Sequence, residues 1–340
     1  MDEGTTVEAG PRRRRRRRRV VALTGVHGAA GAALVRRFEA DERVGRLVLL
    51  DRRAPAMPLR DTSFRGIDLT ATLADVALAE ILAREHVHTV VHAAFHDTPR
   101  RDVEAAHELE VLGTRAVFRA IADNARRAGT VENVVVLGTT ASYGARGDNP
   151  QYLDDDAPLR GGGAYPWVAD KVAVEQEVAS LRTRTGLPIA MLRAAPMLGD
   201  DRTLTARLLA AAFVPAVLGA DPLVQLLHVE DLVEATRLAV HGRYDGAFNV
   251  AADGVLPWST VIKLSGRVRA AFVEPILRPL LRSLWVVGAG LVPGEHVAYL
   301  RETFVADTTR AAEQLGFRGR DGIRGVLARH TGLGWLRRAA

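Results

Sequence analysis

Three glycines near the start of the chain have the spacing of a phosphate-binding turn. Gly25, Gly28 and Gly31 lie in TGVHGAAG, directly after the apolar VVALTG (20–25) and at the start of a helical segment. The first glycine of such a turn allows a tight bend, and the second allows backbone N–H groups to approach a pyrophosphate. The third allows the helix to pack closely on the strand. The pattern therefore predicts a dinucleotide-binding unit.

An acidic residue stands where ribose recognition requires one. Asp51 ends the apolar LVLLD, about 20 residues after Gly31, and its carboxylate would accept hydrogen bonds from the adenosine ribose hydroxyls. The same charge would repel a 2′-phosphate, which favours NAD over NADP, although Arg52 or Arg53 could hold such a phosphate. Asp68 ends the next strand segment, where it would bond the adenine amino group or form a turn or helix cap.

Apolar strand segments alternate with helical segments along most of the chain. We expect strands at 20–25, 46–51, 88–95, 133–140, 189–195 and 224–229, and helices at 32–40, 73–86, 105–129, 169–186 and within 226–242. Such alternation predicts an α/β fold, a Rossmann-type doubly wound parallel sheet.

Beyond residue 195, frequent prolines and glycines predict a smaller C-terminal α/β substrate lobe. The domains expected are an arginine-rich tail at 1–19, a dinucleotide-binding domain at 20–195 with 224–250 returning to it, and a substrate lobe at 196–223 and 251–340.

Composition excludes several kinds of site. The chain has no cysteine, which excludes disulfides, thiolate nucleophiles and cysteine metal sites and favours a cytoplasmic protein. No carboxylate–histidine metal spacing is evident, so we expect no metal.

The net charge of +6 comes mostly from Arg12–Arg19, which predicts a solvated arm or a tether to nucleic acid or an anionic membrane. Charges and prolines break the apolar segment 270–292, so it predicts a core or substrate-lobe helix, or one on a membrane surface, and not a spanning helix.

Further motifs follow in an order typical of one enzyme family. After the glycine turn and Asp51 come VVHAAF, LGTTASYG, LRAAPMLG, LLHVEDLVEA and GAFNVAADG. Together they resemble the extended short-chain dehydrogenases/reductases, the NAD-dependent epimerase/dehydratase family, and within it bacterial UDP-glucose 4-epimerase-like proteins. The resemblance implies a Rossmann domain that holds NAD(P) and a C-terminal lobe that shapes a nucleotide-sugar site. The family often dimerises through a helix pair, which here would include 105–129 and 169–186.

The resemblance also implies individual roles. Thr139 matches the catalytic Ser/Thr, with Thr140 as the alternative, and Lys171 matches the lysine of the YxxxK motif. The remaining matches are the strand end along the cofactor (His92, Ala93, Ala94 and Phe95), the segment beside the nicotinamide (Arg193 and Pro196) and the HVxD turn (His228 and Asp231).

Two positions depart from the family pattern. Trp167 replaces the tyrosine of YxxxK, and Glu110 stands where the family often has asparagine. In the family the phenolate takes a proton from the sugar hydroxyl, and an indole, which is only a donor, cannot do so. Tyr165, just before the helix, and Tyr143 are the candidate replacement bases.

Two functions are therefore open. One is an NAD(P)-dependent epimerase/dehydratase-like oxidoreductase acting on a nucleotide sugar or similar hydroxylated substrate, with Thr139, Lys171 and Tyr165 as catalytic residues. The other is a non-catalytic NAD(P)-binding sensor or scaffold that kept the cofactor pocket and lost the tyrosine.

Overall fold

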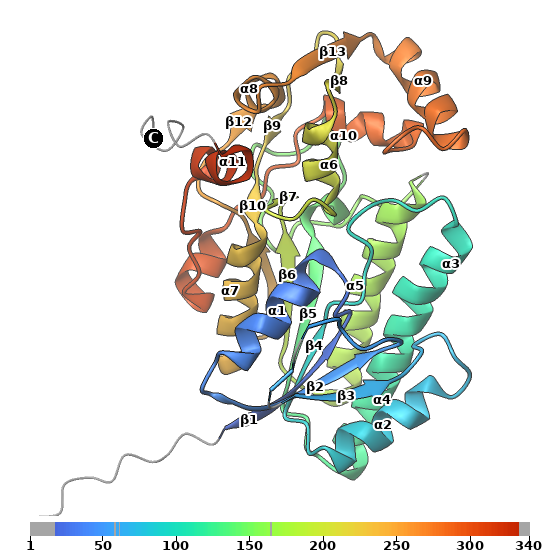
Figure 1. Cartoon of the computed structure of the whole chain (residues 1–340), viewed down its shortest axis with the longest axis vertical. Coiled ribbons are helices and arrows are strands. Elements are labelled where there is room, and N and C mark those ends of the chain that lie inside the picture. Colours follow the sequence, from blue (N-terminus) through green and yellow to red (C-terminus); the bar gives the residue numbers. More distant parts are fainter. Residues whose placement is uncertain (1–17, 58, 61, 164, 333–340) are drawn as a thin grey trace, which may run out of the picture.

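The computed structural model describes residues 18–332 apart from residues 58, 61 and 164, and it is built around one parallel sheet (Figure 1). The strand order is β11-β6-β5-β4-β1-β2-β3. This doubly wound arrangement confirms the predicted fold class. The strands are β1 (Arg19–Thr24), β2 (Val44–Asp51), β3 (Thr62–Gly66), β4 (Thr89–His92), β5 (Asn133–Thr139), β6 (Ile189–Ala194) and β11 (Gly246–Val250).

Helices cover both faces of the sheet, as the alternation of segments predicts. One face carries α1 (Ala29–Glu39) and α7 (Val229–His241), which contact each other. The other face carries α2 (Ala74–Arg84), α4 (Gly113–Arg127) and α5 (Pro166–Thr185), packed side by side in that order. Each layer encloses its own apolar core against the buried strands.

The helix expected at 105–129 is divided into three parts. α3 (Val103–His107) leads into a π-helical turn, η1 (Glu108–Leu112), and α4 follows. A π-helical turn widens the helix locally and re-aims the side chains on it, and such turns are frequent at functional sites. Here it buries Glu110.

A smaller lobe stands beyond the carboxyl ends of the strands (Figure 1). Its strand pairs are β8 (Phe213–Val217) with β13 (Val268–Phe272), β9 (Leu223–Val224) with β12 (Leu256–Pro257), and β7 (Met197–Leu198) with β10 (Leu227–His228). Its helices are α6 (Leu204–Ala210), α8 (Trp258–Leu264), α9 (Glu274–Val286), η3 (Gly294–His296), α10 (Val297–Arg301) and α11 (Ile323–Thr331). The remaining short helical turns are η2 (Thr140–Tyr143) and η4 (Ala311–Leu315).

The strand expected at 224–229 does not join the main sheet. It is divided into β9 and β10, each of two residues, which pair with β12 and β7, and the ring of His228 then caps α7. The strand that returns to the sheet is β11, which pairs with β6.

Two other expectations concern segments outside the sheet. No helix among the described residues is long and apolar enough to cross a membrane. The tether predicted for the arginine run falls mainly on residues 12–17, which lie outside the described part, while Arg19 is the first residue of β1.

Candidate functional site

The glycine turn joins β1 to α1 and closes tightly on the neighbouring strand. Gly25 has a φ of +72°, and a Cβ there would overlap the backbone of Ala93. A Cβ at Gly31 would overlap the carbonyl of Gly25. A Cβ at Gly28 would instead meet Gly25 O at 3.5 Å and Asp97 Oδ2 at 3.9 Å, both ordinary contact distances. The turn thus has the close packing and the open middle position that a pyrophosphate cradle requires.

Asp51 lies beside this turn at the carboxyl end of β2. Its Oδ2 accepts a hydrogen bond from the Val26 N–H at 3.1 Å, and its Oδ1 accepts one from the Arg52 N–H at 2.7 Å. Arg52 also pairs with Asp68 at 3.3 Å, and Thr70 binds the same Asp68 carboxylate, which lowers its pKa. Asp51 is therefore held at the position expected for ribose recognition, while Asp68 is engaged as a turn residue.

Asp97, a residue not predicted from the sequence, stands at the start of α1. Its Oδ2 accepts a hydrogen bond from the Ala29 N–H at 3.1 Å. Burial raises the pKa of this carboxyl. The backbone N–H groups at a helix start are where a phosphate would bind, so the Asp97 carboxylate occupies one of the N–H groups that a phosphate would use. The only sequence signal was an acid in the loop after VVHAAF.

Lys171 and Glu110 form a buried ion pair on the other side of the β4 strand end. Lys171 Nζ lies 2.6 Å from Glu110 Oε2, and the two side chains are 4% and 1% exposed. Nζ also donates to His96 O at 3.1 Å and lies 4.7 Å from the ring centroid of Phe95. Burial raises the pKa of the Glu110 carboxyl, against the pull of the Lys171 charge. The ammonium is thus bound by the Glu110 carboxylate and the His96 carbonyl.

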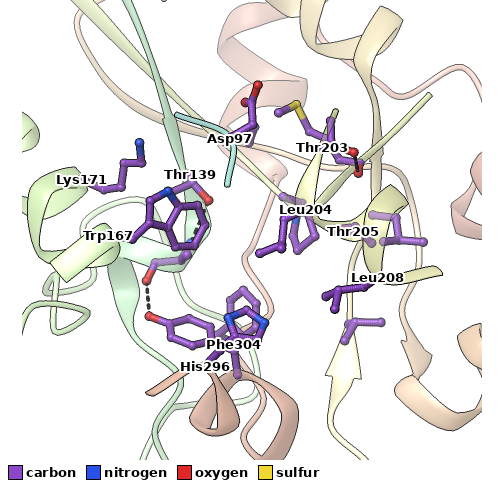
Figure 2. Close-up of a pocket in the computed structure, with 18 of the residues that line it drawn as sticks. Asp97, Thr139, Trp167, Lys171, Thr203, Leu204, Thr205, Leu208, His296 and Phe304 are labelled. Carbon is purple, nitrogen blue, oxygen red and sulfur yellow. Dashed lines mark hydrogen bonds between the residues drawn. The ribbon is translucent and has the colours of Figure 1, made fainter. Parts of the chain in front are cut away.

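One pocket is lined by both Asp97 and Lys171 (Figure 2). It encloses about 910 Å³ of atom-free space, its open mouth included, between the strand ends and the C-terminal lobe. Thr139, at the end of β5, lines it together with Lys171, Phe95 and Asp97. Thr140 is buried beneath, and Thr139 accepts the Ala141 N–H at 3.2 Å. Thr139 is therefore the hydroxyl that faces the pocket.

Comparison with known proteins shows to which family the chain belongs. The chain matches the model of the NAD dependent epimerase/dehydratase family over residues 21–251. The chain belongs to this family. It is 31% identical over 306 residues to an uncharacterized protein of Mycobacterium tuberculosis (strain ATCC 25618 / H37Rv), which covers 88% of this chain and 79% of that protein. The predicted family is confirmed.

Solved structures show the same fold at lower identity. MoeE5 in complex with UDP-glucuronic acid and NAD superposes with a TM-score of 0.70 at 24% identity, over 94% of this chain and 99% of that one. The UDP-glucose 4-epimerase of Thermotoga maritima with UDP-glucose has a TM-score of 0.69 at 16% identity, over 92% and 97% of the two chains.

In this epimerase/dehydratase family member, Trp167 fills the position of the missing phenol. Pro166 begins α5, and Trp167 lies one turn before Lys171 on the same face. The indole Nε1 donates to His96 O at 3.0 Å, the same carbonyl that accepts from Lys171. The ring forms a pocket wall, and its only polar atom is bound to the backbone (Figure 2).

The two candidate replacement tyrosines lie elsewhere. Tyr165 is buried and lines a neighbouring pocket, with its hydroxyl 3.3 Å from His296 Nδ1, and burial raises its pKa well above the usual value. Tyr143 is fully buried, donates to Asn249 Oδ1 at 2.7 Å and accepts from Arg193 at 2.7 Å. Burial raises the pKa of Tyr143 to about 12. Neither side chain is brought to Thr139 and Lys171.

Of the other residues matched to the family, Arg193, His228 and Asp231 lie outside the pocket lining. Arg193 forms a buried ion pair with Glu175 of α5 at 2.6 Å. His228 caps α7 by accepting the Glu230 N–H at 3.2 Å, and Asp231 is buried beside it. Pro196 lines the pocket itself.

The C-terminal lobe contributes pocket residues that the sequence did not indicate. They come from η3, α8, α10 and the segment after it, and comprise Trp258, His296, Tyr299, Leu300 and Phe304. Their positions depend on packing between distant segments, so no local pattern marks them.

Proposed function

We propose that this family member binds NAD at the glycine turn and catalyses oxidation or reduction of a hydroxylated small molecule in the adjoining pocket. A single observation carries the proposal: one pocket extends from the start of α1, where Asp97 lies, to Thr139 and Lys171. A bound nicotinamide would supply or accept the hydride. The glycine turn and Asp51 would hold the dinucleotide, and the Asp51 charge favours NAD over NADP.

The first substrates to test are chosen from those of the similar proteins. Because solved structures of this fold are named in complex with UDP-glucuronic acid or UDP-glucose, nucleotide sugars are the first class to test. In such a site the Thr139 hydroxyl would hydrogen-bond the reacting oxygen. Lys171 would reach a ribose only by exchanging the carboxylate of Glu110 for it. Trp167 would exclude water and could not take the proton.

A second candidate is a non-catalytic NAD-binding sensor or scaffold. The pairing of Lys171 with Glu110 favours it, because the ammonium is neutralised where a phenolate would need its charge. Tyr165→Phe distinguishes the two candidate functions further. If this variant loses turnover, the phenol of Tyr165 acts as a relocated base.

Thermal melts and turnover assays separate the candidates. Both predict that NAD raises the melting temperature, and no shift with either NAD or NADP would contradict both. Turnover of UDP-glucose or another hydroxylated compound by the unmodified protein supports the oxidoreductase. Binding without turnover across a broad panel supports the sensor.

A homodimer through α4 and α5 is part of the proposal and is tested by light scattering.

A further inference from the structure

The walls of the pocket beside Thr139 are mainly apolar. Trp167 stands on one side of it, and Leu204, Thr205 and Leu208 of α6 stand on the opposite side (Figure 2). The apolar lining consists mainly of Phe95, Trp167, Leu204, Leu208, Trp258 and Phe304. A concave site with such walls gains affinity from burying apolar ligand surface.

Three polar groups of the remaining wall residues are bound to the protein itself. The Trp258 indole donates to Pro215 O at 3.1 Å, and the Tyr299 hydroxyl donates to Ala141 O at 2.9 Å. The Thr203 hydroxyl lies 2.9 Å from Met197 O. These groups therefore present their apolar faces to the pocket and offer few hydrogen bonds to the hydroxyls of a sugar.

The charges around the pocket are unsuited to a diphosphate. The chain has 46 basic residues, yet Lys171 is the only arginine or lysine lining this pocket within the described part, and Glu110 neutralises it. Burial lowers the pKa of His296 to about 4, which leaves its ring neutral near pH 7. Asp97 adds a carboxylate. A diphosphate placed here would lose its water without gaining the guanidinium or ammonium partners that phosphates require.

The nearest arginines face other parts of the molecule. Arg202 donates to His27 O at 2.7 Å and pairs with Asp200 at 2.7 Å, beside the glycine turn. Arg207 lies on α6 but lines the neighbouring pocket formed with Arg100 and Arg101. Arg202 is thus placed for the dinucleotide and not for a second diphosphate in the pocket beside Thr139.

We infer that the substrate of this site is an uncharged apolar alcohol or the corresponding ketone, and not a nucleotide sugar. This inference rests on the proposed function and narrows its substrate class. The oxygen of such a molecule would meet Thr139 at the polar end of the pocket, and its apolar body would lie between Trp167 and Leu208. Oxidation removes a hydride from the carbinol carbon, for which NAD⁺ is the acceptor, and a proton from the hydroxyl, which leaves as H⁺.

Calorimetric titration without added dinucleotide tests the inference separately from turnover. The probes are the bicyclic alcohol decahydronaphthol, its ketone decalone, and UDP-glucose. We expect the first two to bind at least about thirtyfold more tightly than UDP-glucose, with a negative heat-capacity change. Equal or tighter binding of UDP-glucose would overturn the inference and leave the proposed function standing. Apolar binding without hydride transfer would leave the apolar ligand class standing and defeat the oxidoreductase of the proposed function.

Two variants locate the ligand. Leu208→Ala should weaken decalone binding by about tenfold, while Leu209→Ala, a buried neighbour on α6 outside the pocket lining, should change it less than about twofold. Thr205→Val replaces a lining hydroxyl by a methyl group, and decalone affinity should not fall, because an apolar body makes no hydrogen bond to that hydroxyl. Decalone binding that is unchanged in Leu208→Ala, or lost in Thr205→Val, would contradict the assignment.

Discussion

The carboxylate of Glu110 lies 2.6 Å from the ammonium of Lys171, and both side chains are buried. This contact exists because the π-helical turn η1 directs Glu110 towards α5. It converts a lysine expected to bind a cofactor ribose into one member of an ion pair. Dinucleotide binding and protein stability should therefore be linked through these two residues.

Glu110→Gln should lower stability and increase the benefit of bound NAD. Removing one partner of a buried ion pair costs about 3–5 kcal/mol, because the remaining charge stays buried without a counter-charge. A bound ribose would give Lys171 new acceptors, so the NAD-induced rise in melting temperature should be larger in the variant. Thermal melts with and without NAD measure this. Glu108→Gln, an exposed neighbour, is the control and should change neither value. An identical NAD shift in Glu110→Gln and the unmodified protein would refute the link.

Trp167→Tyr should create or raise turnover. A positioned acid–base group contributes about 10²–10⁴-fold in rate, and a phenol one turn before Lys171 would restore one. The absorbance of reduced nicotinamide reports the rate. Trp258→Tyr provides the matched control, since this second pocket indole also donates to a backbone carbonyl but lies away from Lys171. A similar gain in both variants would show that the effect comes from pocket volume and not from proton transfer.

NAD affinity should fall as pH rises, because of Asp97. Burial raises the pKa of this carboxyl above its unfolded value of about 3.9, so its contribution to stability is complete below that pH and is lost as pH rises through the raised pKa. The protonated form does not repel a pyrophosphate, and the ionised form does. Calorimetry from about pH 5 to pH 8 should show NAD binding to the unmodified protein weakening as pH rises, and Asp97→Asn should remove this weakening. Near pH 8 the variant should bind NAD about tenfold more tightly than the unmodified protein.

The control for Asp97 comes from the same loop. Asp102 caps α3 by accepting the Ala105 N–H at 3.0 Å and does not contact α1. Asp102→Asn should keep the pH dependence of the unmodified protein. If Asp97→Asn also keeps it, the carboxylate does not compete for the anion site.

Asp51→Asn should shift cofactor preference towards NADP. The amide keeps an oxygen for the Val26 N–H but removes the charge that repels a 2′-phosphate. The exposed Arg53 could then bind this phosphate, as could Arg52 by exchanging Asp68 for it. The ratio of NAD to NADP affinity should fall by at least about tenfold. Asp75→Asn, on the exposed first turn of α2, should leave the ratio unchanged. A ratio that does not move in Asp51→Asn would assign the selectivity to another residue.

Tyr143→Phe should reduce stability and spare function. The variant loses hydrogen bonds with Arg193 and Asn249 in a buried network, which costs about 1–3 kcal/mol. NAD affinity and any turnover should be unchanged, because the phenol does not line the pocket. Tyr152→Phe, at an exposed position, should have no effect on either. Lost turnover with an unchanged melting temperature would restore Tyr143 as a candidate base.

The sequence determined the sheet, the glycine turn and the position of Asp51. These features follow from local patterns: apolar runs of strand length, glycines at fixed spacing and an acid at a strand end. The order of the motifs, which resembles that of the family, then predicted roles for Thr139 and Lys171. The structure has Thr139 at the end of β5 and Lys171 on α5, and both line one pocket. The same reasoning identified Trp167 as a side chain that cannot accept a proton.

Only the tertiary structure decided what these residues contact. The partner of Lys171 depends on a π-helical turn, which no periodicity in 105–129 revealed. The placement of Asp97 at α1 joins residues far apart in the sequence, and Tyr299 reaches Ala141 across a separation of 158 residues. Side-chain chemistry is local and can be predicted from spacing. The charge balance and polarity of a pocket arise from packing between distant segments, and here that packing made the pocket apolar.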